Sequence, residues 1–343
     1  MRRKALLAVT TAASLMFAAG TLAAEEWKFA HEESDGDVQD IYAEEFKRMV
    51  EERTDGEVSV TIYTYGQLGN ENDITELTAN GAVQFSNASP GHLGSFVPEI
   101  QVLLIPYLLS ENEEVNKKVL SNSEALYGEL ADDFQSKGLK LFDIYPEGEM
   151  VWTTKKEVRE PEDLEGVKFR VMTSPLLVEA YDTFGADPVA LPWGEVYSGL
   201  QLNTIDAQVN PIFFIESAKF YEVTDYLIWT GEQEYTTTVV ANSDFWNGLS
   251  EERQDMLMDI RSELTDFIYE EQQKLNQASR ENIKEEAPDI EYVELTAEER
   301  EAFAERAEQL DQFYIDEVGG NAEEVVEKLR SEIEKAEEEM GEN

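Results

Sequence analysis

The chain has 343 residues and no cysteine, and it carries 74 acidic against 27 basic residues, for a formal net charge of −47. The missing cysteine excludes disulfides, thiol catalysis and thiolate metal sites, and the charge excludes nucleic-acid binding, because every phosphate would be repelled. The acids are spread along the whole chain, which favours a surface kept soluble at high salt over a site for a cationic partner. We therefore expect stability to fall in low-salt buffer; a melting temperature equal in dilute buffer and molar NaCl would contradict this.

The first residues read as a secretory signal peptide over residues 1–24. A charged start, Arg2 to Lys4, precedes an apolar run over residues 5–20 and a small-residue stretch that ends at Ala24. The alternative is a membrane anchor, but the run is shorter than the ~20 residues that a span needs. We expect an exported, periplasmic protein whose mature chain is long enough for two domains.

Strands and helices alternate through the first part of the mature chain. The patterns predict strands at 27–31, 57–65, 83–85 and 139–144, helices at 36–54, 70–80 and 111–137, and an apolar run at 102–105. Such alternation is typical of βαβ units and predicts a mostly parallel sheet.

The alternation then starts again and gives way to helices. Strands are predicted at 150–154, 168–172, 188–190, 207–209 and 236–241, and helices at 175–184 and 193–202. One long helix is predicted over 251–286, a capping box at Thr296 opens the next, and the charged tail from Glu334 is expected to fray. We predict two lobes: residues 25–149 with about 237–277, and residues 150–236 with about 278–343. Ligands are expected at the carboxyl ends of the strands.

Four residues between positions 168 and 214 would meet if three adjacent strand ends reached one cleft: Arg170, Trp193, Asn210 and Phe213. A guanidinium fork, an aromatic plate and an amide suit a small organic carboxylate, and none is a nucleophile or a proton shuttle. Each has an ordinary alternative: a structural salt bridge for Arg170, a core position for Trp193, and a helix cap for Asn210. Phe213 is preferred over its neighbour Phe214 as the ring that faces the ligand.

The chain resembles a known family in linked motifs. These are Pro161–Arg170, Phe184–Pro188, Leu191–Gln201 and Ile205–Pro211, which are similar to motifs of the DctP-family solute-binding proteins of tripartite ATP-independent periplasmic (TRAP) transporters. The resemblance implies an α/β, two-lobed periplasmic binding protein of type II-like architecture, with a long inter-lobe helix and a ligand cleft between the lobes. It also implies that Arg170 binds the substrate carboxylate and that TRAP membrane permease subunits receive the solute.

Further stretches are similar to the ectoine- and hydroxyectoine-binding members of this family from halophiles, namely Ala30–Glu33, Gly36–Asp40, Tyr145–Met150 and Asn210–Phe213. Ectoine is a zwitterion with a cyclic amidinium and a carboxylate. The resemblance implies that Glu33 meets the amidinium, that Arg170 clamps the carboxylate, and that aromatic rings box the ligand. The neighbouring Glu32 could take the place of Glu33.

Two positions depart from the family pattern. His92 stands where the ectoine binder has a phenylalanine that stacks on the ligand, and Val209 stands where the family has an acid before Asn-Pro. A neutral His92 could still stack, or it could favour a more polar or anionic ligand. The runner-up ligand is therefore another organic acid: a dicarboxylate, a keto acid or a sugar acid. A dicarboxylate needs a second cation, and Lys28 and Lys219 are the nearest in sequence.

The remaining candidates carry less weight. His31 reads as a packed strand-end residue, and Trp152 could reach the cleft or fill the core. With two histidines, no nucleophile elbow and no glycine-rich phosphate loop, we expect no catalytic residue, no metal and no cofactor. A secreted hydrolase is the alternative from another class. We expect a monomer.

Overall fold

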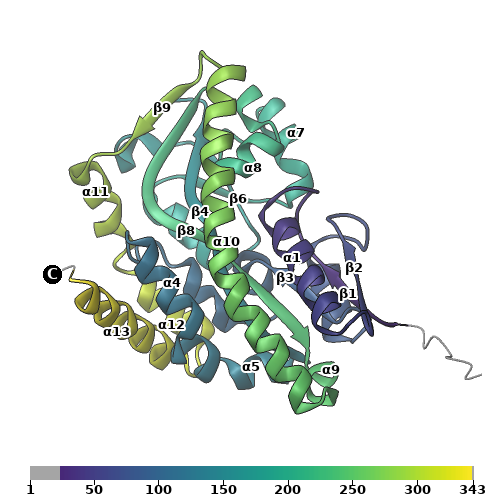
Figure 1. Ribbon diagram of the computed structural model, residues 1–343. Helices are drawn as coiled ribbons and strands as arrows, with labels where there is room; N and C mark the ends of the chain where they lie inside the picture. The colour runs from purple at the N-terminus through teal and green to yellow at the C-terminus, as the bar shows by residue number, and fades with distance from the viewer. Residues whose placement is uncertain (1–23, 342–343) are drawn as a thin grey trace, which may run out of the picture.

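The computed structural model describes residues 24–341, whose strands form one nine-stranded sheet (Figure 1). The strands are β1 (Glu25–Ala30), β2 (Val58–Tyr63), β3 (Phe85–Ala88), β4 (Leu139–Thr154), β5 (Lys168–Val171), β6 (Asp187–Ala190), β7 (Ala207–Pro211), β8 (Tyr226–Asn242) and β9 (Glu291–Glu294). Their order is β2-β1-β3-β8-β4-β7-β5-β6, and β9 pairs with β8 outside this path. The predicted α/β class is confirmed, while the predicted signal peptide lies outside the described residues except for Ala24.

Thirteen α-helices within residues 24–341 surround the sheet. They are α1 (Val38–Arg53), α2 (Glu71–Ala79), α3 (Pro90–Leu93), α4 (Glu113–Asn122), α5 (Ala131–Ser136), α6 (Pro175–Phe184), α7 (Val196–Gln201), α8 (Ile212–Ser217), α9 (Ser243–Gly248), α10 (Glu251–Glu286), α11 (Ala297–Ala307), α12 (Leu310–Val318) and α13 (Ala322–Met340). None of the helices in this part of the chain combines the length and the apolar character that a bilayer crossing requires.

The first lobe is built on the parallel strands β2, β1 and β3. The ring of Phe29 on β1 lies 5.3 Å from Phe46 of α1 and 6.3 Å from Phe85 of β3, so apolar burial fixes the strand between helix and sheet. Because β1 ends in this buried position, the residues that follow it, including Glu33, emerge at the carboxyl edge of the sheet.

The second lobe repeats this design with β6, β5 and β7, which are also parallel. Phe169 of β5 packs 4.4 Å from the ring of Tyr181 on α6, and α6 begins after the side-chain cap Ser174 with Pro175 in its first turn. Successive side chains of a strand point to opposite faces, so Arg170 points away from the face that α6 covers.

Two long strands, β4 and β8, cross between the lobes and pair with each other in antiparallel fashion. The predicted mostly parallel sheet holds for five of the eight strand pairs in the described residues, and the antiparallel pairs are those that β4 and β8 make with each other, with β7 and with β3. The gap predicted between the strands at 139–144 and 150–154 is wrong, because β4 continues through a register shift between Pro146 and Gly148. Gly148 adopts φ +125°, and a Cβ on it would lie 2.5 Å from Asn276 Nδ2 of α10. The glycine therefore permits a close approach of the helix to a continuous strand.

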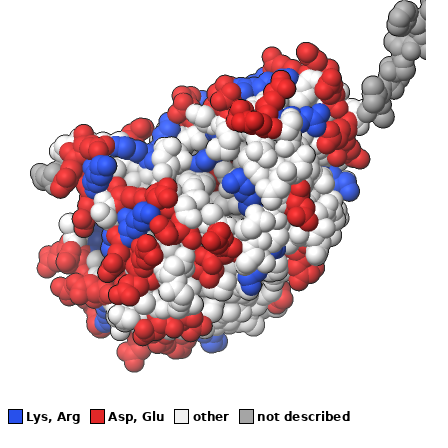
Figure 2. Space-filling model, turned by 90° about the horizontal axis from the view of Figure 1, so that it is seen from below, with Lys and Arg blue, Asp and Glu red and all other residues white. Residues whose placement is uncertain are grey.

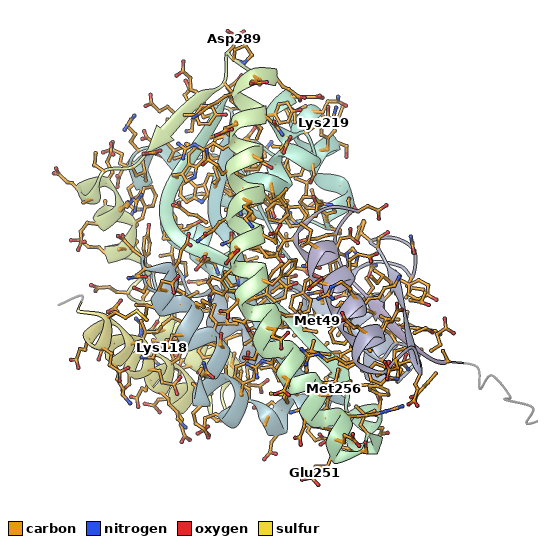
Figure 3. The ribbon with its side chains drawn as sticks, in the orientation of Figure 1. Met49, Lys118, Lys219, Glu251, Met256 and Asp289 are labelled. Carbon is orange, nitrogen blue, oxygen red and sulfur yellow. The ribbon has the colours of Figure 1, made fainter. Side chains whose placement is uncertain are left out.

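The long helix α10 is confirmed with its predicted bounds and contacts both lobes. It packs on α1, β4 and α8, and Figure 1 shows it running along the length of the molecule. In Figure 3, Glu251 marks the first residue of α10, and Asp289 lies in the turn just beyond its last residue, Glu286. This helix therefore holds the crossing strands and both lobes together.

The predicted helix over 111–137 is broken into α4, a π-helical turn over Ala125–Glu129, and α5, because Ser123 adopts an extended ψ of 126°. The apolar run at 102–105 belongs mostly to a 3-10 helix over Pro98–Leu104.

The C-terminal helices follow the prediction only in part. Thr296 and Glu299 form the predicted capping box at the start of α11. The tail does not fray at Glu334, because α13 continues to Met340 and buries Ile333 and Ala336. This helix packs on α4, which favours placing it with the first lobe. The lobe boundaries otherwise stay a prediction.

The acidic residues are distributed over the surface as the sequence indicated. Figure 2 shows carboxylates over much of one face, with lysines and arginines scattered among them. Many of the cations pair locally, as Arg48 does with Glu45 and Glu52.

Candidate functional site

Carboxyl ends of strands from both lobes meet the crossing strands at one place, which we call the inter-lobe site and define by Glu33, Glu147, Arg170, Trp193 and Tyr235. Glu33 follows β1, Arg170 lies on β5, and Trp193 follows β6, whereas Glu147 and Tyr235 come from β4 and β8. Apart from the half-buried Trp193, these side chains are buried.

The two lobes touch around this site. Gly91 follows β3 and lies against Met172, which follows β5: a Cβ on Gly91 would be 2.4 Å from Met172 Cε. Nearby, a Cβ on Gly194 would be 3.7 Å from the hydroxyl of Tyr65. The first contact leaves no room for a side chain at position 91, so the lobes are close together in this structure.

Arg170 is a buried cation with an open donor. Its side chain is 1% exposed, and its Nε donates to the carbonyl of Leu191 at 2.9 Å. Its Nη2 has no hydrogen-bond partner, and no carboxylate of the described residues lies within ion-pair distance of it. Burial lowers the pKa of Arg170 to about 10, which leaves it charged at neutral pH. The salt-bridge alternative finds no partner for it in residues 24–341.

The opposite side of the site is acidic and equally buried. Glu33 Oε2 accepts from the backbone N–H of Gln39 at 2.8 Å, and Glu147 Oε1 accepts from Gln39 Nε2 at 3.1 Å. Glu32 Oε2 accepts from the backbone N–H of Ser89 at 2.9 Å. Each of the three carboxyl groups keeps a second oxygen without a donor in the part of the chain described. Buried acceptors left in this way are costly, so the site is set to receive donors.

Burial keeps these acids partly protonated near neutral pH. It raises the pKa of Glu32 to about 8 and that of Glu147 to about 7. Burial and the charge of the neighbouring Glu147 raise the pKa of Glu33 well above its usual range. The carboxyl groups of Glu33 and Glu147 therefore titrate as a coupled pair, and a cation can bind between them once the pair loses a proton.

An aromatic wall completes the site. The ring of Trp193 lies 4.7 Å from that of Phe214, which also meets Tyr235 edge-on at 6.2 Å. Phe213 stacks on Phe214 at 4.7 Å. The structure thus joins Trp193 to Phe214, the ring not preferred from the sequence, and the role of Phe213 stays a prediction. Trp193 also packs 5.3 Å from Phe220, so it is part core and part wall.

Asn210 lies on β7 and is 5% exposed. Its amide donates to Gln208, and Pro211 rather than Asn210 stands at the N-cap of α8, without a side-chain cap hydrogen bond. The capping alternative is therefore wrong. A direct role in ligand binding stays a prediction.

The two histidines differ. His92 is 8% exposed, its Nδ1 lies 3.0 Å from the hydroxyl of Ser89, and burial with the nearby charge of Arg170 lowers its pKa to about 3. His92 is thus neutral beside the arginine. His31 is fully buried, with Nε2 3.3 Å from Asp40, which confirms it as a packed strand-end residue.

Trp152 fills the core. It is fully buried, and its Nε1 donates to Glu232 at 2.5 Å and to the hydroxyl of Tyr181 at 3.1 Å.

Three site residues were not selected from the sequence: Glu147, Tyr235 and Glu71. Glu71 is buried in the first turn of α2 and feels the charge of Arg170. Tyr235 is buried near Glu147 and Glu32. Glu147 lies in one of the stretches that carried the resemblance, but it is one acid among 74. Only its position on a crossing strand distinguishes it.

Comparison with known proteins gives consistent matches. The family model of bacterial extracellular solute-binding proteins, family 7 (DctP), matches residues 29–317. The chain is 40% identical over 334 residues to the ectoine-binding periplasmic protein TeaA of Halomonas elongata, which covers 97% of each chain. It is 41% identical over 323 residues to the ectoine/5-hydroxyectoine-binding periplasmic protein UehA of Ruegeria pomeroyi, covering 94% of this chain and 95% of that one.

A solved structure agrees with these matches. The periplasmic ectoine-binding protein from the TeaABC TRAP transporter of Halomonas elongata superposes with a TM-score of 0.87 at 40% identity, covering 91% of this chain and 100% of that one. The predicted two-lobed architecture and the export of the protein are thereby confirmed. The chain belongs to the DctP family of bacterial extracellular solute-binding proteins, the solute receptors of TRAP transporters.

Proposed function

We propose that this protein is a periplasmic receptor that encloses ectoine or hydroxyectoine between its lobes and delivers it to the membrane permease subunits of a TRAP transporter. In this proposal Arg170 binds the ligand carboxylate, Glu33 and Glu147 bind the amidinium, and the wall of Trp193 and Phe214 covers the ring. The ligand class is supported by the similarity to TeaA, an ectoine-binding protein, and to UehA, an ectoine/5-hydroxyectoine-binding protein.

The observation that carries the proposal is the pair of opposite, unsatisfied charges in one buried site. Arg170 Nη2 lacks an acceptor on one side, while Glu33 Oε1 and Glu147 Oε2 lack donors on the other, all counted over residues 24–341. A zwitterion satisfies both sides at once, and charge-assisted hydrogen bonds are the strong ones. A delocalised cyclic cation also suits aromatic faces.

A dicarboxylate fits this arrangement less well. Its second carboxylate would meet the acidic side, and the two lysines considered from the sequence do not help. The side chain of Lys219 is 61% exposed and lies 3.6 Å from Glu222, near the outer end of α10 in Figure 3. Lys28 lies inside β1, ahead of the carboxyl end from which the site residues emerge. His92 is neutral and adds no second cation.

Calorimetric titration of the mature chain in molar NaCl tests the proposal. We expect saturable one-to-one binding of ectoine and hydroxyectoine, with the ligand recovered unchanged, and much weaker binding of succinate and glucuronate. Recovery of unchanged ligand separates a receptor from a hydrolase. Absence of ectoine binding, or equally tight binding of succinate, would overturn the proposed ligand.

A further inference from the structure

A second cavity lies on the crossing strands and is separate from the inter-lobe site. It has a volume of about 210 Å³, and its apolar wall is formed by Leu103, Ile105 and Leu109. Glu232 and Glu234 of β8 line it. Side chains alternate between the two faces of a strand, so these two acids point away from the face on which Tyr235 reaches the inter-lobe site.

The polar lining of this cavity is dominated by carboxylates. Glu149, Glu232 and Glu234 line it together with Arg300, whose guanidinium lies 3.5 Å from Glu111. Over residues 24–341, none of the first three carboxylates has a lysine, arginine or histidine within ion-pair distance. Asn116 Nδ2 donates to Glu234 Oε2 at 2.8 Å, and the lining, which also includes Glu111 and Glu113, still carries more carboxylates than cations.

The hydrogen bonding of Glu232 independently supports a ligand site at this cavity. Its side chain is 1% exposed, and its Oε1 accepts both the indole N–H of Trp152 and the hydroxyl of Tyr181, at 2.5 and 2.6 Å. Its Oε2 has no donor anywhere in the described chain. Trp152 and Tyr181 thus both bind Oε1 of Glu232, and Oε2 of this cavity-lining residue stays without a partner. Burial also raises the pKa of Glu232 to about 7 and that of Glu234 to about 8.

The lining of this cavity does not suit a metal ion. Within residues 24–341 no group of three or more histidine, cysteine, aspartate or glutamate side chains is arranged to hold a metal. An unpaired carboxylate oxygen requires an N–H or O–H donor, and three aliphatic side chains offer a surface for methylene groups. We propose that this cavity binds a short aliphatic ammonium ion, with its N–H donors on Glu232 and Glu234 and its carbon chain on Leu103, Ile105 and Leu109.

Binding of two amines to the mature protein tests the proposal. Calorimetric titration with 1,4-diaminobutane and n-butylamine is done in 1 M NaCl, where the Debye length of ~3 Å suppresses attraction to the acidic surface. We expect saturable binding of at least one of them, and at least fivefold weaker binding of tetramethylammonium, which has the charge but no N–H donor. No saturable binding of either amine would overturn the proposal.

Three variants locate the site. Glu232→Gln keeps an acceptor for Trp152 and Tyr181, and we expect it to weaken amine binding about tenfold or more. Glu149 is exposed, and Glu149→Gln is expected to weaken amine binding a few-fold by removing a charge. Glu76→Gln on α2 is the matched control without effect. If Glu76→Gln weakens binding as much as Glu149→Gln does, the amine is only a counterion and the proposal fails.

The new cavity is independent of the proposed function. Arg170→Ala removes the cation of the inter-lobe site and is expected to leave amine binding unchanged within twofold. If the protein binds the amines but not ectoine, the proposed function is wrong and the second site stands. A protein that binds ectoine but neither amine would sink only the second site.

Discussion

The two sides of the inter-lobe site are built in contrasting ways. The second lobe contributes one fixed cation, Arg170, beside an aromatic wall, whereas the first lobe and β4 contribute the acids Glu32, Glu33 and Glu147. Although both sides are buried, they do not neutralise each other, because each keeps polar atoms without a partner in the described residues. The charges missing from the site are those that a zwitterion brings.

This contrast bears on closure of the lobes. A buried charge without a partner costs several kcal/mol, so the closed arrangement is unfavourable when the site is empty. A ligand that satisfies both sides removes that cost only in the closed form, and it therefore shifts the population toward closure. The closed form is then populated mainly when the correct ligand is bound.

Removing the cation Arg170 should have the largest effect on ligand affinity. In Arg170→Ala the ligand carboxylate loses its charged donor and affinity should fall about thirtyfold or more, since truncating one partner of a buried charge pair costs about 2–5 kcal/mol. Calorimetric titration with ectoine measures this. The ligand-free melting temperature should not fall, because an unpaired buried charge is removed.

Arg159→Ala is the control for this change. Arg159 is exposed and pairs with Glu157 and Glu299 on the surface, so its loss should leave affinity unchanged. An Arg170→Ala protein with affinity within threefold of the native value would show that the carboxylate is held elsewhere.

The two sides also differ in how far the sequence predicts them. Arg170, Trp193 and Asn210 fall within one segment whose short strands, turns and helix starts could be read locally. The acidic side is assembled from residues more than a hundred positions apart, Glu33 and Glu147. Glu147 was not recognised because it lies between the strands predicted at 139–144 and 150–154, whereas cross-strand pairing carries β4 through this gap as an irregular strand.

Neutralising the acidic side is expected to have the next largest effect. Glu33→Gln and Glu147→Gln each remove a charge-assisted hydrogen bond to the amidinium, worth about 1.5–3 kcal/mol, so affinity should fall roughly tenfold to a hundredfold. Glu32→Gln decides which neighbour acts, since its Oε2 is already held by Ser89. A larger loss from Glu32→Gln than from Glu33→Gln would reverse the assignment. The exposed Glu44→Gln is the control.

Acidification should weaken the acidic side without any mutation. The raised pKa values of Glu147, about 7, and of Glu33 mean that a cation must displace a proton near neutral pH. Affinity should fall about tenfold between pH 8 and pH 6, because one displaced proton changes affinity by up to about tenfold per pH unit. Titration in buffers of different ionisation enthalpy counts the protons released. Affinity that rises on acidification would contradict the acid pair.

The ligand-free protein should show the opposite trend with pH. Acids whose pKa is raised by folding bind more protons in the native than in the unfolded state, so stability falls as pH rises from about 4.5 through their native pKa values. With Glu147 at about 7 and Glu32 at about 8, the melting temperature should decrease between pH 5 and pH 8. Glu147→Gln should flatten this slope, and an unchanged slope would count against its burial as an acid.

The smallest expected effect comes from the contact that brings the two sides together. In Gly91→Ala the new methyl group would lie 2.4 Å from Met172 Cε and 2.6 Å from its sulfur, so the flexible methionine must move or the lobes must separate. Overpacking of this kind costs roughly 1 kcal/mol at its mild end, which predicts about a fivefold loss of ectoine affinity. Adding Met172→Ala to the variant should restore most of the loss by making room. Gly194→Ala is the matched control across the same interface, because its methyl group would lie at an ordinary 3.7 Å from Tyr65. If Gly91→Ala binds as tightly as Gly194→Ala does, the ligand-bound lobes are not as close at this contact as the structure has them.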